Sequence, residues 1–403
     1  MASSALLSTI GIGVQGAAKL VVTVVIGRVF GTETLGQATA LLSLSVFAAL
    51  LWPSAAGNTA SRYLALALRT GRSDAALNRL LGRTMLVCSV VLAGCTVPVA
   101  VAWGNGPGTV LGGVGVVVGY GLYAYTRGAQ LGYGRARRVA GWDVVTSTLT
   151  FALLVLACVT GAEPFVLVPI AVGYTVFAIA CWPRGASGLR RGAAPAGTAS
   201  TDGVLGFAGW NVLAGLTANG LLQLAMIAAT VTASQHDAGV YAAAFTLATP
   251  ASMVGQAVGQ AVIPAFAHRA HASSLRSRGA VLLVGGFAAG TAALFGLVAL
   301  LAPWFLPLFY PAEGAAAVSD LRFLVVGVWV FTVSLLPAAL LLSAGRSKQV
   351  ALASIAGFVA GTVLMAVLSP VLGVAGGTVG FLVGSVVNLV TVVVLGLRRP
   401  AVD

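Results

Sequence analysis

The sequence predicts an all-α polytopic membrane protein of about 12 transmembrane helices, arranged as two parallel six-helix repeats with both termini in the cytoplasm. Three observations lead to this fold class. The composition is 59% hydrophobic and only 8% charged, whereas soluble domains carry about 25% charged residues. The basic residues gather in alternate gaps between apolar runs, and short motifs recur in the two halves of the chain. So few charges cannot cover a water-facing surface, so we expect lipid around most of the chain.

Apolar runs of about 20 residues, the length that crosses a bilayer as a helix, recur along the whole chain. They lack the alternation of barrel strands, and only helices or closed barrels satisfy the backbone in lipid. Charges, prolines and glycine clusters divide them into spans at residues 4–27, 35–57, 83–103, 108–127, 140–160, 164–182, 204–231, 238–265, 279–302, 321–343, 349–369 and 373–396. The first run is long and has no basic segment before it, so we expect a retained helix and not a cleavable signal peptide.

Basic residues set the expected orientation, because they favour cytoplasmic loops. With the N-terminus in the cytoplasm, 19 of the 22 Lys and Arg residues fall on the cytoplasmic side. The expected loop between the second and third spans holds five of them: Arg62, Arg69, Arg72, Arg79 and Arg83. The net charge of +13 therefore reflects multi-pass topology in the cell inner (plasma) membrane, and we expect no nucleic-acid partner.

A polar segment divides the chain near its middle. Residues 184–202 are rich in Gly, Ala, Ser and Arg, which predicts a cytoplasmic linker. It separates an N-terminal six-helix half, residues 1–183, from a C-terminal six-helix half, residues 203–403. Because each half has an even number of helices, the two copies share one orientation. Parallel repeats of this kind are typical of transporters, whose substrate site lies between the halves.

Short motifs support the repeat. Residues 131–140 align with residues 342–351 at an offset of 211, and the same offset pairs Gly173 with Gly384. Residues 35–38 align with residues 238–241 at an offset of 203.

Lys19 is the most informative single residue, because it lies deep in the first span. An ionised group at this depth costs at least about 2.5 kcal/mol and usually marks a functional position. At 100° per residue, Lys19 shares one helix face with Gln15, which predicts a polar stripe facing a cavity. Alternatively, Lys19 reaches outward to the membrane surface or holds two helices together.

Two later spans carry similar polar stripes. The seventh carries Asn211, Asn219, Gln223 and Thr230, and the eighth carries Thr249, Ser252, Gln256 and Gln260. Together with the first span, these stripes could line one central cavity that binds substrate. Alternatively, the same side chains form hydrogen bonds between helices.

Three charged residues have both a structural and a functional interpretation. Asp143 lies just inside the cytoplasmic end of the fifth span, where it forms an ion pair with Arg137 or Arg138 or binds a coupling ion. Arg28 and Arg62 are expected to cap the first and second spans on opposite sides of the membrane. Each anchors the topology or binds an anionic headgroup.

No catalytic, cofactor-binding or metal-binding signature emerges from the sequence, so we expect no enzyme. It has no Walker A lysine loop, no Gly-x-Ser-x-Gly, no Cys-x-x-Cys and no carboxylate pair in a span. His268 and His271 lack carboxylate or Cys support, so we expect no metal there. The four cysteines all lie in apolar runs and are interpreted as buried hydrophobes.

Residues 27–38 resemble the R-x-x-G-x-x-x-x-G-x-Y turn of polysaccharide-biosynthesis (O-antigen-type) flippases, in the multidrug/oligosaccharidyl-lipid/polysaccharide exporter superfamily. Arg28, Gly31 and Gly36 match, whereas the aromatic residue expected near Ala38 is missing. Residues 238–244, followed by Pro264, resemble the family's G-x-Y-x-x-A…P stretch, and residues 130–134 resemble its short loop after the fourth helix.

The resemblance implies a flippase that carries an undecaprenyl-pyrophosphate-linked oligosaccharide to the outer leaflet by alternating access, functional as a monomer. It implies that Lys19 binds the pyrophosphate. One alternative is a proton- or sodium-coupled exporter of a drug or natural product. The loop after the second span does not match the major facilitator pattern. A membrane glycan ligase or glycosyltransferase is the other alternative, but such enzymes generally need a sizeable polar outer loop, and residues 303–320 are mostly apolar.

Overall fold

The computed structural model describes residues 2–184, 201, 203–249, 278–343 and 346–397. Within these ranges every regular element is a helix, which confirms the all-α fold class. Ten of the described helices are long and apolar enough to cross a bilayer. The protein is therefore a multi-pass membrane protein. The full number of twelve spans and the cytoplasmic location of both termini stay predictions.

The chain divides into two compact units. Unit 1 comprises Met1–Val22 and Ala40–Asn219, and unit 2 comprises Thr23–Thr39 and Gly220–Asp403. The predicted boundary between the six-helix halves stays a prediction, because most of residues 184–202 lie outside the described ranges.

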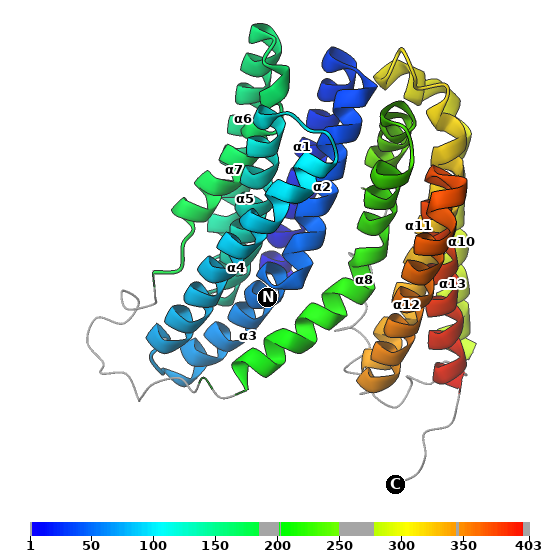
Figure 1. Cartoon of the computed structure of the whole chain (residues 1–403). Coiled ribbons are helices and arrows are strands. Elements are labelled where there is room, and N and C mark those ends of the chain that lie inside the picture. The colour runs from blue at the N-terminus through cyan, green and yellow to red at the C-terminus, as the bar shows by residue number, and fades with distance from the viewer. Residues whose placement is uncertain (1, 185–200, 202, 250–277, 344–345, 398–403) are drawn as a thin grey trace. The chain divides into compact units, whose positions relative to one another are not determined.

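Three helices contribute to both units: α1 (Ala2–Phe30), α2 (Thr32–Leu51) and α8 (Val204–Thr232). Unit 1 adds α3 (Pro53–Thr70), α4 (Ala75–Ala102), α5 (Pro107–Gly132), α6 (Ala136–Thr160), the 3-10 helix η1 (Glu163–Phe165) and α7 (Val168–Ala180). Unit 2 adds helical residues 235–249, α10 (Arg278–Phe309), α11 (Ala317–Ser343), α12 (Ser347–Leu372) and α13 (Val374–Leu397). The main packed pairs are α3–α5, α5–α7, α4–α5 and α6–α7 in unit 1, and α12–α13, α11–α13 and α10–α11 in unit 2 (Figure 1).

The expected polar loop between the second and third spans is mostly helix, which corrects the sequence prediction. α3 runs from Pro53 to Thr70 and α4 starts at Ala75, so only a short turn separates them. Arg62 therefore lies inside α3 and does not cap a span. Arg interrupts an apolar run without breaking a helix, because its long unbranched side chain has a good helix propensity. Gly71 ends α3 in the left-handed conformation, with φ +67°.

α3 has two faces of different character. Leu64 and Ala67 are buried and pack with Leu77 and other residues of α4 and α5. The opposite face exposes Asn58, Arg62 and Arg69. This division explains why α3 is too polar to count as a span of its own.

A glycine contact recurs at the predicted offset of 211. A methyl group built on Gly384 of α13 would lie 2.7 Å from the carbonyl oxygen of Gly357 in α12. In unit 1, a methyl group built on Gly173 of α7 would lie 3.2 Å from the carbonyl oxygen of Thr146 in α6. Gly173 and Gly384, and likewise Thr146 and Gly357, are 211 residues apart. This agreement supports the alignment, while the six-helix repeat itself stays a prediction.

The second predicted offset pairs two glycines that meet within unit 2. A methyl group built on Gly36 would lie 3.0 Å from the Cα atom of Gly239. Nearby, one built on Gly27 would lie 2.6 Å from the ring of Tyr310, whose hydroxyl is 3.0 Å from Oγ1 of Thr246. These contacts hold residues 23–39 closely against the rest of unit 2.

Candidate functional site

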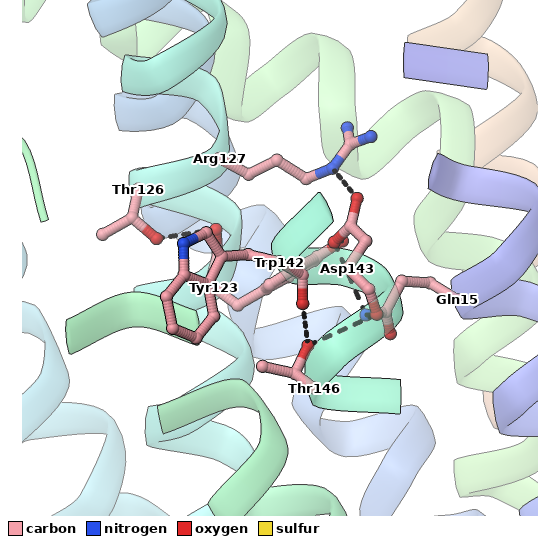
Figure 2. Close-up of polar contacts among 7 residues, drawn as sticks. All are labelled: Gln15, Tyr123, Thr126, Arg127, Trp142, Asp143 and Thr146. Carbon is pink, nitrogen blue, oxygen red and sulfur yellow. Dashed lines mark hydrogen bonds and ion pairs between the residues drawn. The ribbon is translucent and has the colours of Figure 1, made fainter. Parts of the chain in front are cut away.

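A buried carboxylate is the centre of the polar cluster in unit 1. Asp143 of α6 is 0% exposed. Its side chain meets Gln15 of α1 and both Tyr123 and Arg127 of α5 (Figure 2). An ionised carboxylate in an apolar interior is costly unless it is paired and hydrogen-bonded. These partners are therefore what allow a charge at this position.

α5 supplies both a cation and a hydroxyl to this carboxylate. Nε of Arg127 lies 3.5 Å from Oδ2 of Asp143, and the Arg127 side chain is only 12% exposed. One turn earlier on α5, Tyr123 donates its hydroxyl to Oδ1 of Asp143 at 3.0 Å. The i, i+4 spacing places both side chains on one face of the helix. The pair cancels the buried charge and links α5 to α6.

Gln15 connects α1 to the same residue. Its Nε2 atom donates to the main-chain oxygen of Asp143 at 3.3 Å and to Oδ1 at 3.5 Å. Both bonds are long for an N–H···O hydrogen bond, so each contributes little on its own. The attachment of α1 to α6 at this point therefore depends on the charge and orientation of one carboxyl group.

Aromatic rings cover the Tyr123 side of the cluster. The ring centroid of Tyr123 lies 4.7 Å from that of Phe177, 5.0 Å from that of Tyr174 and 6.0 Å from that of Tyr120. Rings at these separations pack favourably and exclude water. The Tyr123 side of the Asp143 carboxyl group is therefore dry, whereas Arg127 keeps some contact with solvent.

The predicted partner of Asp143 was wrong. We expected Arg137 or Arg138, but the ion pair is with Arg127. Arg137 and Arg138 precede Asp143 by six and five residues, which turns them away from it around the helix at 100° per residue. Arg137 is exposed, and Arg138 donates to the carbonyl oxygen of Ala180 at 2.7 Å.

Arg62 forms a second polar feature in unit 1. Its Cζ atom lies 4.6 Å from the ring centroid of Phe207 in α8 and 6.0 Å from that of Tyr63. The two rings are themselves in edge contact, with centroids 5.8 Å apart. A guanidinium over an aromatic face at this distance is a cation–π interaction. The exposed Arg62 side chain is thus held on an aromatic surface between α3 and α8.

The other predicted site residues of unit 1 are partly buried. Lys19 lies one helical turn after Gln15 on α1. Asn211 donates to the carbonyl oxygen of Phe207 in its own helix at 2.8 Å. Asn219 lies two turns further along α8. The structure brings Gln15 to Asp143, and the contact of Lys19 and Asn219 with substrate stays a prediction.

The remaining predicted residues belong to unit 2. Arg28 is exposed in the last turn of α1. Gln223 is 6% exposed, and its Oε1 atom accepts no hydrogen bond from the part of the chain that the structure describes. Gln256 and Gln260 lie outside the described ranges, as does Pro264 of the second-half motif.

Polar side chains in or next to the repeated loop motif contact the end of a neighbouring helix in both units. Near the end of α5, Gln130 donates to the carbonyl oxygen of Cys181 at 2.6 Å, just after α7. Before α12, Arg346 donates to the carbonyl oxygens of Leu395 and Gly396 at 2.6 and 3.1 Å, in the last turn of α13. The final carbonyls of a helix have no partner within the helix, and these side chains supply one.

The sequence reasoning missed Tyr123, Arg127 and Phe207. Arg127 is the last residue of the predicted fourth span and was not considered as a partner of Asp143, and the two aromatic residues were not singled out. A usable signal was present, because Tyr123 and Arg127 form an i, i+4 polar pair at the end of an otherwise uncharged span. No comparable signal marks Phe207.

The fold of the chain, unlike its sequence, matches that of known proteins. No protein-family model matches the sequence, and no curated protein matches it either. The fold is nevertheless shared with solved membrane transporters. A multidrug resistance MATE family transporter of the MOP superfamily, in its inward-facing conformation, aligns with a TM-score of 0.71 at 16% identity over 95% of this chain and 93% of that one.

Two further structures agree. Lipid II flippase MurJ, in its inward closed conformation, gives a TM-score of 0.70 at 9% identity over 97% of this chain and 87% of that one. A MATE structure in the bent conformation gives 0.60 at 17% identity, over 98% of this chain and 93% of that one. The chain therefore has the fold of MATE transporters and of Lipid II flippase MurJ. The polysaccharide-flippase subtype stays a prediction.

Proposed function

We propose that the protein is a transporter that moves an undecaprenyl-pyrophosphate-linked oligosaccharide from the inner to the outer leaflet of the cell membrane by alternating access. The fold shared with Lipid II flippase MurJ supports this proposal, since that protein is named as a flippase of Lipid II. In this proposal the chain works as a monomer with both termini in the cytoplasm, and it needs no cofactor and no nucleic-acid partner.

The observation that carries the proposal is the placement of two cations. Arg62 is exposed on α3, and no hydrogen bond or ion pair from the described chain occupies its guanidinium. Lys19 is partly buried within α1. A pyrophosphate needs cationic donors, and Arg supplies a planar fork that suits it. We assign the headgroup to Arg62 and Lys19, with Arg28 as a further anion contact.

The polar uncharged residues complete the proposed substrate path: Gln15, Asn211, Asn219, Gln223, Gln256 and Gln260. Their amides can bond sugar hydroxyls without adding charge. Asp143 is assigned to ion coupling, because a proton or cation bound there would disturb both the Arg127 pair and the Gln15 contact with α1. The coupled ion is left open between a proton and sodium.

A second candidate is a proton- or sodium-coupled exporter of a drug or natural product. The likeness to a multidrug resistance MATE transporter, with a TM-score of 0.71, favours this candidate. It predicts the same role for Asp143 but no pyrophosphate at Arg62. A membrane glycan ligase or glycosyltransferase receives no support from the Asp143 or Arg62 clusters.

The deciding experiment is a lipid extract from cells that lack the protein, with the lipid-linked oligosaccharides separated and quantified. We expect accumulation of a polyprenyl-pyrophosphate glycan together with loss of the matching surface polysaccharide. An unchanged lipid pool would contradict the flippase and favour the small-molecule exporter.

Lys19 offers a matched test within the same cells, because the chain has only two lysines. Lys19→Ala is expected to abolish transport with normal protein level and membrane insertion, whereas Lys19→Arg retains part of it. Lys348→Ala, at an exposed position in the first turn of α12, is the control and should transport normally. Full transport by Lys19→Ala would remove Lys19 from the pyrophosphate site.

A further inference from the structure

Arg62 is held over aromatic rings, as is Arg135, whose Cζ atom lies 4.9 Å from the ring centroid of Tyr133, but Arg135 also donates to Oε1 of Gln130 at 3.4 Å. Arg127 is paired with Asp143, and Arg138 donates to a helix carbonyl. Arg69, two turns beyond Arg62 on the same exposed face of α3, has no aromatic ring beneath it in the described chain. Arg62 alone on α3 combines an aromatic support with unoccupied donors.

The aromatic support constrains the orientation of the guanidinium. Phe207 lies 4.6 Å from Cζ of Arg62, and Tyr63 packs against the edge of the Phe207 ring. An aromatic ring offers no oxygen acceptor, so the N–H groups of Arg62 that do not face the ring remain available for an anion. A free arginine side chain loses rotamer entropy when it is fixed for binding. Part of that loss is already incurred in the unbound protein.

The support itself is anchored. Tyr63 packs beside the core formed by Leu64, Leu77 and their neighbours, and this core includes Val204, one turn before the partly buried Phe207. Two helices far apart in the sequence, α3 and α8, therefore cooperate to place one cation. Figure 1 shows the start of α8 beside α3.

We propose that Phe207 is a positioning residue that holds the Arg62 guanidinium for bidentate binding of a phosphate-type anion. This inference rests on the proposed function, in which Arg62 contacts the pyrophosphate of a lipid-linked substrate. The same chemistry exists in the headgroups of anionic membrane lipids, so the test separates these two sources.

The experiment measures binding of farnesyl pyrophosphate to the purified full-length protein in lipid nanodiscs, with farnesol as the uncharged control. Nanodiscs made with and without phosphatidylglycerol distinguish the substrate headgroup from the lipid headgroup. Phe207→Leu removes the aromatic face, Phe207→Tyr retains it, and Arg69→Ala removes an exposed cation that has no ring. Size-exclusion chromatography checks that every variant stays folded and monodisperse.

Phe207→Leu is expected to weaken farnesyl pyrophosphate binding about 2- to 5-fold, the equilibrium equivalent of an exposed cation–π contact. Arg62→Ala should weaken it at least about tenfold, since it removes charge-assisted hydrogen bonds. Arg62→Lys keeps the charge but loses the planar fork, so it should restore only part. Phe207→Tyr and Arg69→Ala should bind as wild type, and farnesol binding should not change in any variant.

The outcomes separate this inference from the proposed function. Wild-type affinity in Phe207→Leu, with weak binding in Arg62→Ala, would overturn the positioning role and leave the proposed function standing. Failure of the wild-type protein to prefer farnesyl pyrophosphate over farnesol would overturn the proposed function itself. Competition by phosphatidylglycerol that disappears in Arg62→Ala would support anion binding and overturn its assignment to the substrate.

Discussion

The ion pair between Arg127 and Asp143 makes a quantitative prediction about stability. Arg127→Gln leaves a fully buried carboxylate without its counter-charge, a change that typically costs about 3 to 5 kcal/mol. We expect a cost of about 3 kcal/mol, because Tyr123 and Gln15 still donate to the carboxylate. The matched control is Arg137→Gln, which removes an exposed arginine and should stay within about 0.5 kcal/mol of wild type.

The double variant Arg127→Gln/Asp143→Asn removes both charges at once. We expect it to be more stable than Arg127→Gln alone, with a coupling energy of about 2 kcal/mol between the two sites, because neither charge is then left unpaired. The assay is unfolding in mixed micelles by titration with sodium dodecyl sulfate, followed by circular dichroism. A loss below about 1 kcal/mol for Arg127→Gln, or additive effects in the double variant, would refute the buried pair.

Three further predictions test the packing and the helix ends. Gly384→Ala should destabilise the protein by about 2 kcal/mol, because the new methyl group would press on α12. The control Gly290→Ala meets nothing within 4 Å and should be neutral or stabilising. Equal effects of the two variants in the same titration would contradict the close packing. Arg346→Ala should cost about 2 kcal/mol through loss of two charged bonds to helix carbonyls, with Arg346→Lys intermediate; wild-type stability of the Ala variant would argue against the cap. Burial raises the pKa of the Cys181 thiol to about 11 despite the nearby Arg138. A variant that keeps Cys181 as its single cysteine should therefore react with iodoacetamide very slowly at pH 8, and about tenfold faster per pH unit up to the pKa. Rapid labelling of the folded protein at pH 8 would contradict this.

The helices could be predicted from the sequence because each apolar run must satisfy its own backbone in lipid. α3 shows where that reasoning fails. Asn58, Arg62 and Arg69 lower the hydropathy of α3, so the sequence predicts a loop at its residues 58–70. Hydropathy indicates whether a segment prefers lipid or water. Helix formation depends instead on backbone propensity and on a buried face, which in α3 includes Leu64 and Ala67. A polar face on one side does not prevent a helix.

The candidate site could be predicted only in part, for a related reason. Asp143 was identified because a carboxylate inside a span is costly and rare. Its partner was missed because Arg127 was treated as the end of a span, although α5 continues to Gly132. Contacts such as Gln15 with Asp143 join residues 128 positions apart. No single-sequence pattern gives the rotation of α1 that brings these two side chains together.

The predicted offset of 211 also shows where the two units differ in chemistry. It pairs Asp143 with Ser354 of α12 and Tyr123 with Ser334 of α11. In unit 2, Nδ2 of Asn388 donates to Oγ of Ser334 at 3.2 Å, so a polar contact recurs in this neighbourhood without any charge. α12 and α13 contain no acidic residue. Since the packing of Gly384 and its counterpart is alike while α12 and α13 hold no acidic residue, we expect a response to protons or cations among these aligned positions to originate at Asp143.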